Sequence, residues 1–287
     1  MPPLQAPDAA QLQAAQHQAK DHGFLWRLHK GGHTSYLYGT LHVAKLAWVF
    51  PGPQMLRALR ETDRLALELN LLDPETAKAL QAGAREPAPQ KVPEAFASWV
   101  KERADALCLS LTDLQALNPG FQAINITLAE ARVQGLEAAY GIDLILAMSA
   151  QGYGRPIDAL ESVQTQLDVL TVGGQEDDLE ALEELDPVAM EKQKDVLVRS
   201  ANAWATSDYA TMNDYPSWCH CMDREADRVR MKRALEGRNP HLADGIDALH
   251  MQGHKVFAAV GSLHTIGSEA GLPALLTRRG YRVERVF

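Results

Sequence analysis

Two short apolar runs near opposite ends of the chain each lead into a glycine and then a histidine. Residues 36–38 precede Gly39-Thr40-Leu41-His42, and residues 256–260 precede Gly261-Ser262-Leu263-His264. Such continuous apolar runs are typical of strands buried on both faces of a parallel sheet. Catalytic groups in these sheets gather at the carboxyl ends of the strands. We therefore expect His42 and His264 to meet at one edge of one sheet.

The rest of the hydrophobic pattern predicts more strands near both ends of the chain and helices between them. Strands are expected at 24–28, 35–39, 64–69, 157–160, 256–260 and 281–286, with a hairpin at Gly31-Gly32. Helices are expected at 9–22, 53–60, 141–151 and 268–279 and through most of 73–139 and 163–252. We predict an α/β fold with a mixed, mainly parallel sheet built from both chain ends, flanked by helices. Residues 1–23 would form a peripheral N-terminal helix, and residues 24–287 a single domain with a mostly helical insertion at about 73–252.

Composition and charge exclude several classes of protein. Hydrophobic residues make up 46 % of the 287 residues, which is ordinary for a soluble globular chain. The net charge of −9 argues against a nucleic-acid partner, which usually needs a basic patch. No apolar run approaches the ~20 residues of a membrane span, so we expect no transmembrane segment. No export leader follows Met1; a periplasmic or secreted location would require that a leader was removed, and the location is otherwise cytoplasmic.

The cysteines Cys108, Cys219 and Cys221 do not form a disulfide framework, because their number is odd. Cys219-His220-Cys221 looks like a fragment of a metal site, but a zinc site needs a second pair of ligands, which is missing here. Two arrangements remain open. One is a long-range disulfide that involves Cys108, and the other is three reduced thiols.

Four expected strand ends carry side chains that suit catalysis: His42, Glu68, Glu161 and His264. Two histidines and a carboxylate can form a three-ligand metal site that leaves a position open for water. Imidazole nitrogen and carboxylate oxygen suit zinc, manganese, cobalt or iron. The same residues could also act without a metal, with one histidine as general base, oriented by a carboxylate, and the other histidine or an arginine stabilising an oxyanion.

Each of these residues also has a purely structural interpretation. His42 alone would more often be a hydrogen-bonded residue at a strand end, and Glu68 could cap a helix. Glu161 could lie beside the N-cap of the following helix, where its negative charge suits the helix dipole. The repeated strand-Gly-x-Leu-His pattern favours function. For Arg238, which could bind a carboxylate or an oxyanion, the residues favour a surface position beside an N-cap Asn239.

The chain resembles the TraB/PrgY/GumN family, which includes the Tiki-type proteases. The resemblance rests on several short motifs in a characteristic order: Leu25-Trp26-Arg27, Tyr36 to His42, Leu67-Glu68-Leu69-Asn70, Gly141-Ile142-Asp143 through Pro156 to Ser162, Gln164 to Leu170, Arg238-Asn239, Val260 to Gly267, Gly271-Leu272-Pro273 and Gly280-Tyr281-Arg282-Val283. Together they cover most of the chain.

The resemblance implies an α/β fold related to erythromycin-esterase-like and ChaN-like proteins, with a site made of His42, His264 and Glu68. Tiki-type members are regarded as proteases that depend on manganese or cobalt, whereas the related esterases are thought to use histidine without a metal. Other members concern peptide pheromone shutdown or occur in polysaccharide gene clusters. GumN-like members often carry an export leader, which favours an exported form with Cys219 or Cys221 bridged to Cys108.

We therefore expect a metal-dependent hydrolase that acts on a peptide or an ester. His42, Glu68 and His264 would bind the metal, Glu161 or the remaining carboxylate would act as base, and Arg238 would steady the substrate or the oxyanion. Asn239, Thr40 and Ser262 are expected to contact the substrate. The alternative is a protein of the same fold that binds a peptide, haem or another metal complex without turnover.

Overall fold

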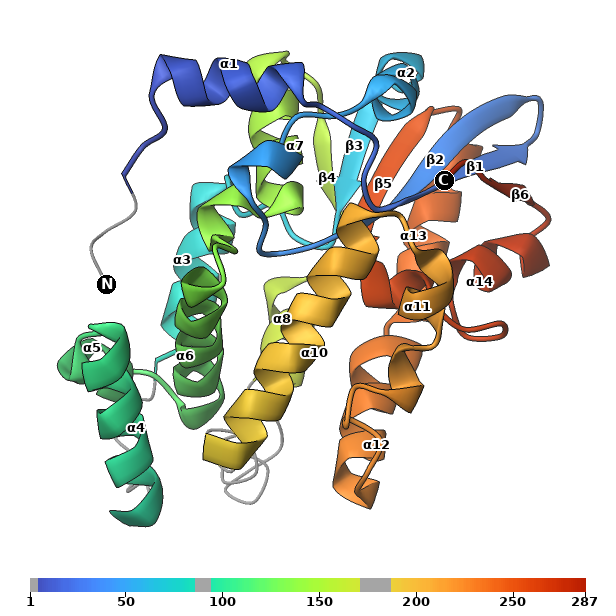
Figure 1. Ribbon diagram of the computed structural model, residues 1–287. Coiled ribbons are helices and arrows are strands. Elements are labelled where there is room, and N and C mark those ends of the chain that lie inside the picture. Colours follow the sequence, from blue (N-terminus) through green and yellow to red (C-terminus); the bar gives the residue numbers. More distant parts are fainter. Residues whose placement is uncertain (1–4, 86–93, 171–186) are drawn as a thin grey trace.

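The computed structural model describes residues 5–85, 94–170 and 187–287 (Figure 1). Within these residues a six-stranded sheet has the order β4-β3-β5-β2-β1-β6. The strands are β1 (Phe24–Lys30), β2 (His33–Thr40), β3 (Arg64–Leu67), β4 (Ile157–Ala159), β5 (Val256–Gly261) and β6 (Arg282–Arg285). The predicted sheet built from both chain ends is thus confirmed.

The four strands that carry the predicted site residues run parallel and lie next to one another. β5 pairs in parallel with both β2 and β3, and β3 pairs in parallel with β4. Only β1 runs the other way, because it forms the predicted hairpin with β2 and pairs antiparallel with β6. The carboxyl ends of β2, β3, β4 and β5 therefore meet at one edge of the sheet.

Strand β5 lies in the middle of the core and is apolar on both faces. Each residue from Val256 to Val260 is at most 1 % exposed. Helices α13 and α14 pack against each other, with α13 also against β5 and α14 against β6, while α7 packs against β3 and β4. Such two-sided cover explains why the strand is a continuous apolar run in the sequence.

The helices of the described residues flank the sheet or extend beyond it (Figure 1). They are α1 (Ala9–His17), α2 (Pro53–Glu61), α3 (Pro74–Gly83), α4 (Glu94–Leu107), α5 (Leu111–Gln115), α6 (Pro119–Val133), α7 (Ile142–Gly152), α8 (Val163–Leu170), α10 (Pro187–Ala205), α11 (Tyr209–Asn213), α12 (Glu225–Met231), α13 (Asn239–Met251) and α14 (Leu272–Arg278). The acidic part of the predicted helix that begins at residue 163 lies largely outside the described residues. No described helix has the length and apolar character needed to cross a membrane.

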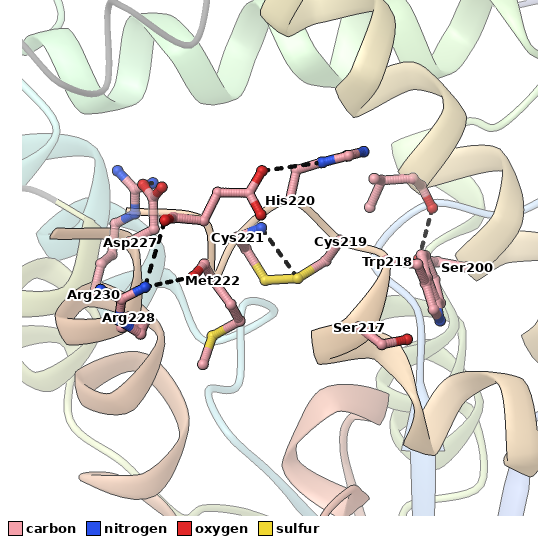
Figure 2. The surroundings of a disulfide bond; sticks show 12 residues. Ser200, Ser217, Trp218, Cys219, His220, Cys221, Met222, Asp227, Arg228 and Arg230 are labelled. Atoms are coloured by element: carbon pink, nitrogen blue, oxygen red, sulfur yellow. Dashed lines mark hydrogen bonds and ion pairs between the residues drawn. A yellow bond between two sulfur atoms is a disulfide. The ribbon is translucent and has the colours of Figure 1, made fainter. Parts of the chain in front are cut away.

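The cysteine pairing differs from the expectation. Cys219 and Cys221 form a disulfide with each other (Figure 2), whereas Cys108 is free and exposed. The expected long-range bridge to Cys108 is wrong. His220 has a φ of 58°, a left-handed conformation that turns the backbone between the two cysteines. Their Cα atoms lie 5.1 Å apart, which is within the usual range for a disulfide.

Candidate functional site

The sheet edge brings the four predicted strand-end residues together. His42 follows β2, Glu68 follows β3, Glu161 follows β4, and His264 lies in a short 3₁₀ helix, Ser262–Thr265, directly after β5. Because these strands are consecutive neighbours in the sheet, side chains that are far apart in the sequence become neighbours in space.

Gly261 marks the point on which His42, Glu68 and His264 converge. A Cβ atom added to Gly261 would lie 3.4 Å from Glu68 Oε1, 3.7 Å from His264 Cδ2 and 3.8 Å from His42 Nε2. Glycine at this position therefore leaves open a small space that all three side chains border. The Gly261 N–H also donates a hydrogen bond to Glu68 Oε1 at 2.7 Å, which fixes the carboxylate against the end of β5.

Arg238 binds two acidic residues of the site, Glu68 and Glu161. Its Nη2 donates to Glu68 Oε2 at 2.6 Å and to Glu161 Oε2, and its Nε donates to Glu161 Oε1 at 2.9 Å. The side chains of Glu161, Arg238 and Glu68 are only 0 %, 10 % and 12 % exposed. Gln166 donates from Nε2 to Glu68 Oε2 and Glu161 Oε2 as well. The side chains of Glu68, Glu161, Gln166 and Arg238 thus form one polar network at this edge of the sheet.

The structural interpretations of Arg238 and Glu68 are not supported by the observed contacts. Arg238 lies inside the site rather than on the surface, so that prediction is wrong, and no side chain caps the start of α13. Asp73, not Glu68, caps α3 through the Thr76 N–H. Ser162 accepts from the first turn of α8, so Glu161 does lie directly before the capping residue of that helix, in addition to its pair with Arg238.

His264 is oriented by a buried asparagine. Its Nδ1 lies 2.6 Å from Asn239 Oδ1, and Asn239 in turn donates from Nδ2 to the Ala270 carbonyl. Because the amide oxygen can only accept, Nδ1 carries the proton and Nε2 keeps its lone pair. That nitrogen lies 3.7 Å from Glu68 Oε2. The side chain of His264 is 5 % exposed, so its direction is fixed by protein contacts rather than by solvent.

His42 is oriented by a carboxylate from α7. Its Nδ1 lies 3.2 Å from Asp143 Oδ1, and its side chain is 65 % exposed. The backbone around it explains the Gly141-Ile142-Asp143 motif. A Cβ on Gly141 would come within 2.7 Å of the His42 carbonyl oxygen, and the Ile142 N–H donates to the Leu41 carbonyl at 2.8 Å. Glycine thus lets α7 begin close to His42, where Asp143 reaches the ring.

The three residues expected to contact substrate are all buried. Thr40, Asn239 and Ser262 are 1 %, 2 % and 3 % exposed. Ser262 donates from Oγ to the Thr40 carbonyl at 2.8 Å and so ties the ends of β5 and β2 together. The Thr40 hydroxyl has no hydrogen-bond partner within the described part of the chain. A role in substrate binding stays a prediction for each of them.

The environments of the two histidines shift their pKa values in opposite directions. The nearby Asp143 carboxylate raises the pKa of His42 and outweighs desolvation, which would lower it. Because the side chain of His42 is 65 % exposed, solvent weakens this interaction. Burial lowers the pKa of His264. Burial alone would raise the pKa of Glu68, but the positive charges around it (that of His264 whenever it is protonated, then those of His42 and Arg238) and the Gly261 N–H outweigh burial and lower that pKa. At neutral pH the site therefore favours a charged His42, a neutral His264 and an ionised Glu68.

The donors fit a divalent metal by type but not by spacing. Both imidazole Nε2 atoms are free of hydrogen-bonded protein partners among the described contacts, and each Nδ1 is close to an oxygen, as is common in metal sites. Glu68, however, already accepts from Gly261, Arg238 and Gln166. Within residues 5–85, 94–170 and 187–287, no three His, Cys, Asp or Glu side chains are grouped so that they could hold one ion.

Two residues of the site, Asp143 and Gln166, were not predicted individually. Asp143 lies in the first turn of α7 and Gln166 in the middle of α8, so neither follows a strand. Both fall inside motifs that carry the family resemblance, and that was the available signal. Without such a resemblance, an acid in a first helical turn indicates only a favourable charge for the helix dipole.

The sequence model of the TraB/PrgY/gumN family matches residues 24–285, which is nearly the whole chain. Searches of curated proteins and of solved structures found no match. The matched range begins with β1 and ends with β6, so it includes every strand of the described sheet and every residue of the site.

Proposed function

The chain belongs to the TraB/PrgY/gumN family, and on that premise we propose that it is a hydrolase of peptide or ester bonds whose centre is His42, Glu68 and His264. One observation supports this above all. Two histidines with opposite charge preferences border one open space beside a buried glutamate. Paired titratable groups whose environments separate their pKa values are the usual arrangement for a general acid and a general base.

In this proposal His264 is the general base. Its Nε2 lone pair takes a proton from a water molecule in the space beside Gly261, and the water oxygen attacks the carbonyl carbon of the substrate. Asn239 is a positioning residue, because its Oδ1 holds the Nδ1 proton and leaves the Nε2 lone pair free on a ring whose Cδ2 borders that space. Imidazole is a suitable base here, since burial favours its neutral form.

His42 has the complementary role. As an imidazolium it donates from Nε2 to the oxygen that becomes negative in the tetrahedral intermediate. When that intermediate collapses and the acyl bond breaks, the leaving amine or alkoxide takes a proton from His42. His264 then releases the proton that it took from the water, and His42 is protonated again through solvent. Asp143 stabilises the ring while it is charged, and its 3.2 Å contact with Nδ1 is the reason for assigning the charge to His42 rather than to His264.

Glu161 and Arg238 act through other residues in this proposal. The Glu161 side chain is fully buried and both oxygens accept from Arg238, so it cannot reach a water as the expected base. Arg238 is held by two carboxylates and a backbone carbonyl, that of Ala234. Its task is to fix Glu68 and to offset the two negative charges, and Glu68 in turn offsets the charge that His264 gains.

The family resemblance also implies a divalent metal, but the described side chains of His42, His264 and Glu68 are not spaced to hold one ion, so no step is assigned to a metal. The steps above do not depend on it. The non-catalytic alternative would suit a wide apolar cleft with the histidines apart, whereas His42 Nε2 and the His264 ring border one small space.

A substrate screen of the purified chain tests the proposal. Chromogenic esters and internally quenched peptides are offered to the parent with and without Mn²⁺, Co²⁺, Zn²⁺ or Fe²⁺. The substrate that is turned over is then offered to His42→Gln, His264→Gln and, as a matched control, His241→Gln, which changes an exposed histidine of α13. We expect losses of about 10²- to 10⁴-fold for the first two variants and none for the control. A parent without activity on either class, or site variants at the full rate, would contradict the proposal.

A further inference from the structure

A cavity of about 1130 Å³ lies apart from the candidate site, between α1, α2, α7 and the 3₁₀ turn Leu46–Trp48. Figure 1 shows these helices close together at the top of the molecule. None of His42, Glu68 and His264 lines it. Ile142 and Ile145 of α7 do, whereas Asp143 of the same helix contacts His42. Helix α7 therefore stands between the cavity and the candidate site, and the two are separate.

The wall of this cavity is apolar and continues to the protein surface. Most of its lining consists of aliphatic, aromatic and methionine side chains. The described residues expose eight large hydrophobic side chains, and four of these line the cavity: Leu12, Leu56, Met148 and Tyr153, at 39 %, 37 %, 54 % and 87 % exposure. Exposed apolar side chains grouped in this way mark a binding site more often than scattered ones do.

The charged residues of the lining are all basic. Lys20, Arg60 and Arg155 line the cavity, and no Asp or Glu does, although the chain has a net charge of −9. Within the described residues none of the three forms an ion pair; Arg155 donates from Nη1 to the Thr62 hydroxyl at 3.2 Å. Three basic groups without acidic partners around an apolar wall are complementary to a molecule with a long apolar body and one negative charge.

We propose that this cavity binds one long-chain fatty acid. The acyl chain would lie against the apolar wall, and the carboxylate would pair with a basic residue of the lining. A peptide is disfavoured because its many backbone polar groups would lose water against a mostly apolar wall, and each unpaired group is costly to bury. A fatty acid carries one polar group, and the negative charge of that group is opposite in sign to the charges of the basic residues. This site is independent of the proposed hydrolysis.

Calorimetric titration of the full chain with monomeric hexadecanoate tests the proposal. We expect binding of one molecule per chain, at least tenfold tighter than that of hexadecan-1-ol, which has the same chain without the charge. Octanoate should bind more weakly than hexadecanoate, since it buries fewer methylene groups. No binding of hexadecanoate, or equal affinity for the acid and the alcohol, would overturn the proposal.

Two pairs of variants locate the binding. Ser149→Trp fills the cavity from an exposed position of α7 and should abolish binding, whereas Met251→Trp, at an exposed position of α13 outside the cavity, should not change it. Arg60→Gln should weaken hexadecanoate about tenfold and leave the alcohol unchanged. Arg57 lies one turn earlier on α2 and does not line the cavity, so Arg57→Gln serves as the control. Normal binding by Ser149→Trp, or adsorption to phosphatidylcholine vesicles in place of monomer binding, would overturn the assignment.

Discussion

Replacement of Arg238 by methionine should strongly destabilise the fold. Methionine keeps much of the apolar stem but removes the guanidinium that joins Glu68 and Glu161, whose side chains are 12 % and 0 % exposed. Breaking a buried ion pair by removing one partner typically costs about 3–5 kcal/mol, because the remaining charge is left buried without compensation. We expect a loss of that size in the free energy of unfolding.

A double-mutant cycle separates the lost pair from the lost packing. Glu161→Gln keeps the shape of the glutamate and removes the charge that Arg238→Met leaves uncompensated. The double variant should therefore be more stable than the sum of the two single changes predicts, by about 2 kcal/mol. Arg282→Met serves as a control, because its pair with Glu284 is 68 % and 47 % exposed and should contribute at most about 1 kcal/mol.

Urea unfolding at neutral pH, followed by circular dichroism, gives these free energies. The expected order of stability is parent and Arg282→Met, then the double variant, then Arg238→Met. If Arg238→Met lost no more than the exposed control, the buried network would not stabilise the sheet edge. If the two changes were additive, Arg238 and Glu161 would not act as a pair.

Three further changes probe other parts of the structure. Burial lowers the pKa of His250, so the unfolded chain binds a proton at a higher pH than the folded chain does, and the free energy of unfolding should decline below about pH 6.5. A His250→Gln variant with the same pH dependence of its unfolding free energy would refute this. Asn239→Leu should lower kcat/KM about 10- to 100-fold with the fold intact, because His264 loses the group that holds its Nδ1 proton; an unchanged rate would remove Asn239 from the site. Cys221→Ser should cost no more than about 2 kcal/mol in urea unfolding, since a bridge between residues two apart restrains the unfolded chain little; a larger loss would show that the bridge holds more than its own loop.

The strands and their site residues could be predicted from the sequence because local pattern and topology agree there. The apolar run of β5 is explained by cover on both faces, and it places Gly261 and His264 at a carboxyl end. Parallel pairing with β2 and β3 then brings His42 and Glu68 to the same edge. The continuous apolar runs, together with the rule that parallel strands end at the same edge of a sheet, were sufficient to predict this part of the site.

Arg238 shows where that reasoning stops. Arg238-Asn239-Pro240 has the local pattern of a helix start, and such a pattern favours a cap and a surface arginine. In the structure a π-helical turn, Lys232–Glu236, precedes it, and Arg238 reaches Glu68 at a sequence distance of 170 residues. That contact depends on the tertiary arrangement of α13 against the sheet, which no local pattern encodes.

The disulfide was missed for a similar reason. In an extended Cys-x-Cys segment the two side chains lie on the same face, but their Cα atoms are about 6.6–6.8 Å apart, at the upper limit for a disulfide. The left-handed conformation of His220 brings them together instead, and it is a conformation that few residues other than glycine adopt.

The rate of the Gly261→Ala variant tests most directly whether His42, Glu68 and His264 form one reactive centre. The added methyl group fits without a clash, since its neighbours lie 3.4–3.8 Å away, and it occupies the space where the proposed water and carbonyl meet. Gly152→Ala is the matched control, because a Cβ there meets nothing within 4 Å. On a substrate of the parent, we expect kcat/KM to fall at least about 100-fold for Gly261→Ala, with unchanged circular dichroism, and to stay at the parent value for Gly152→Ala. A folded Gly261→Ala variant with the parent rate would show that the reaction takes place elsewhere.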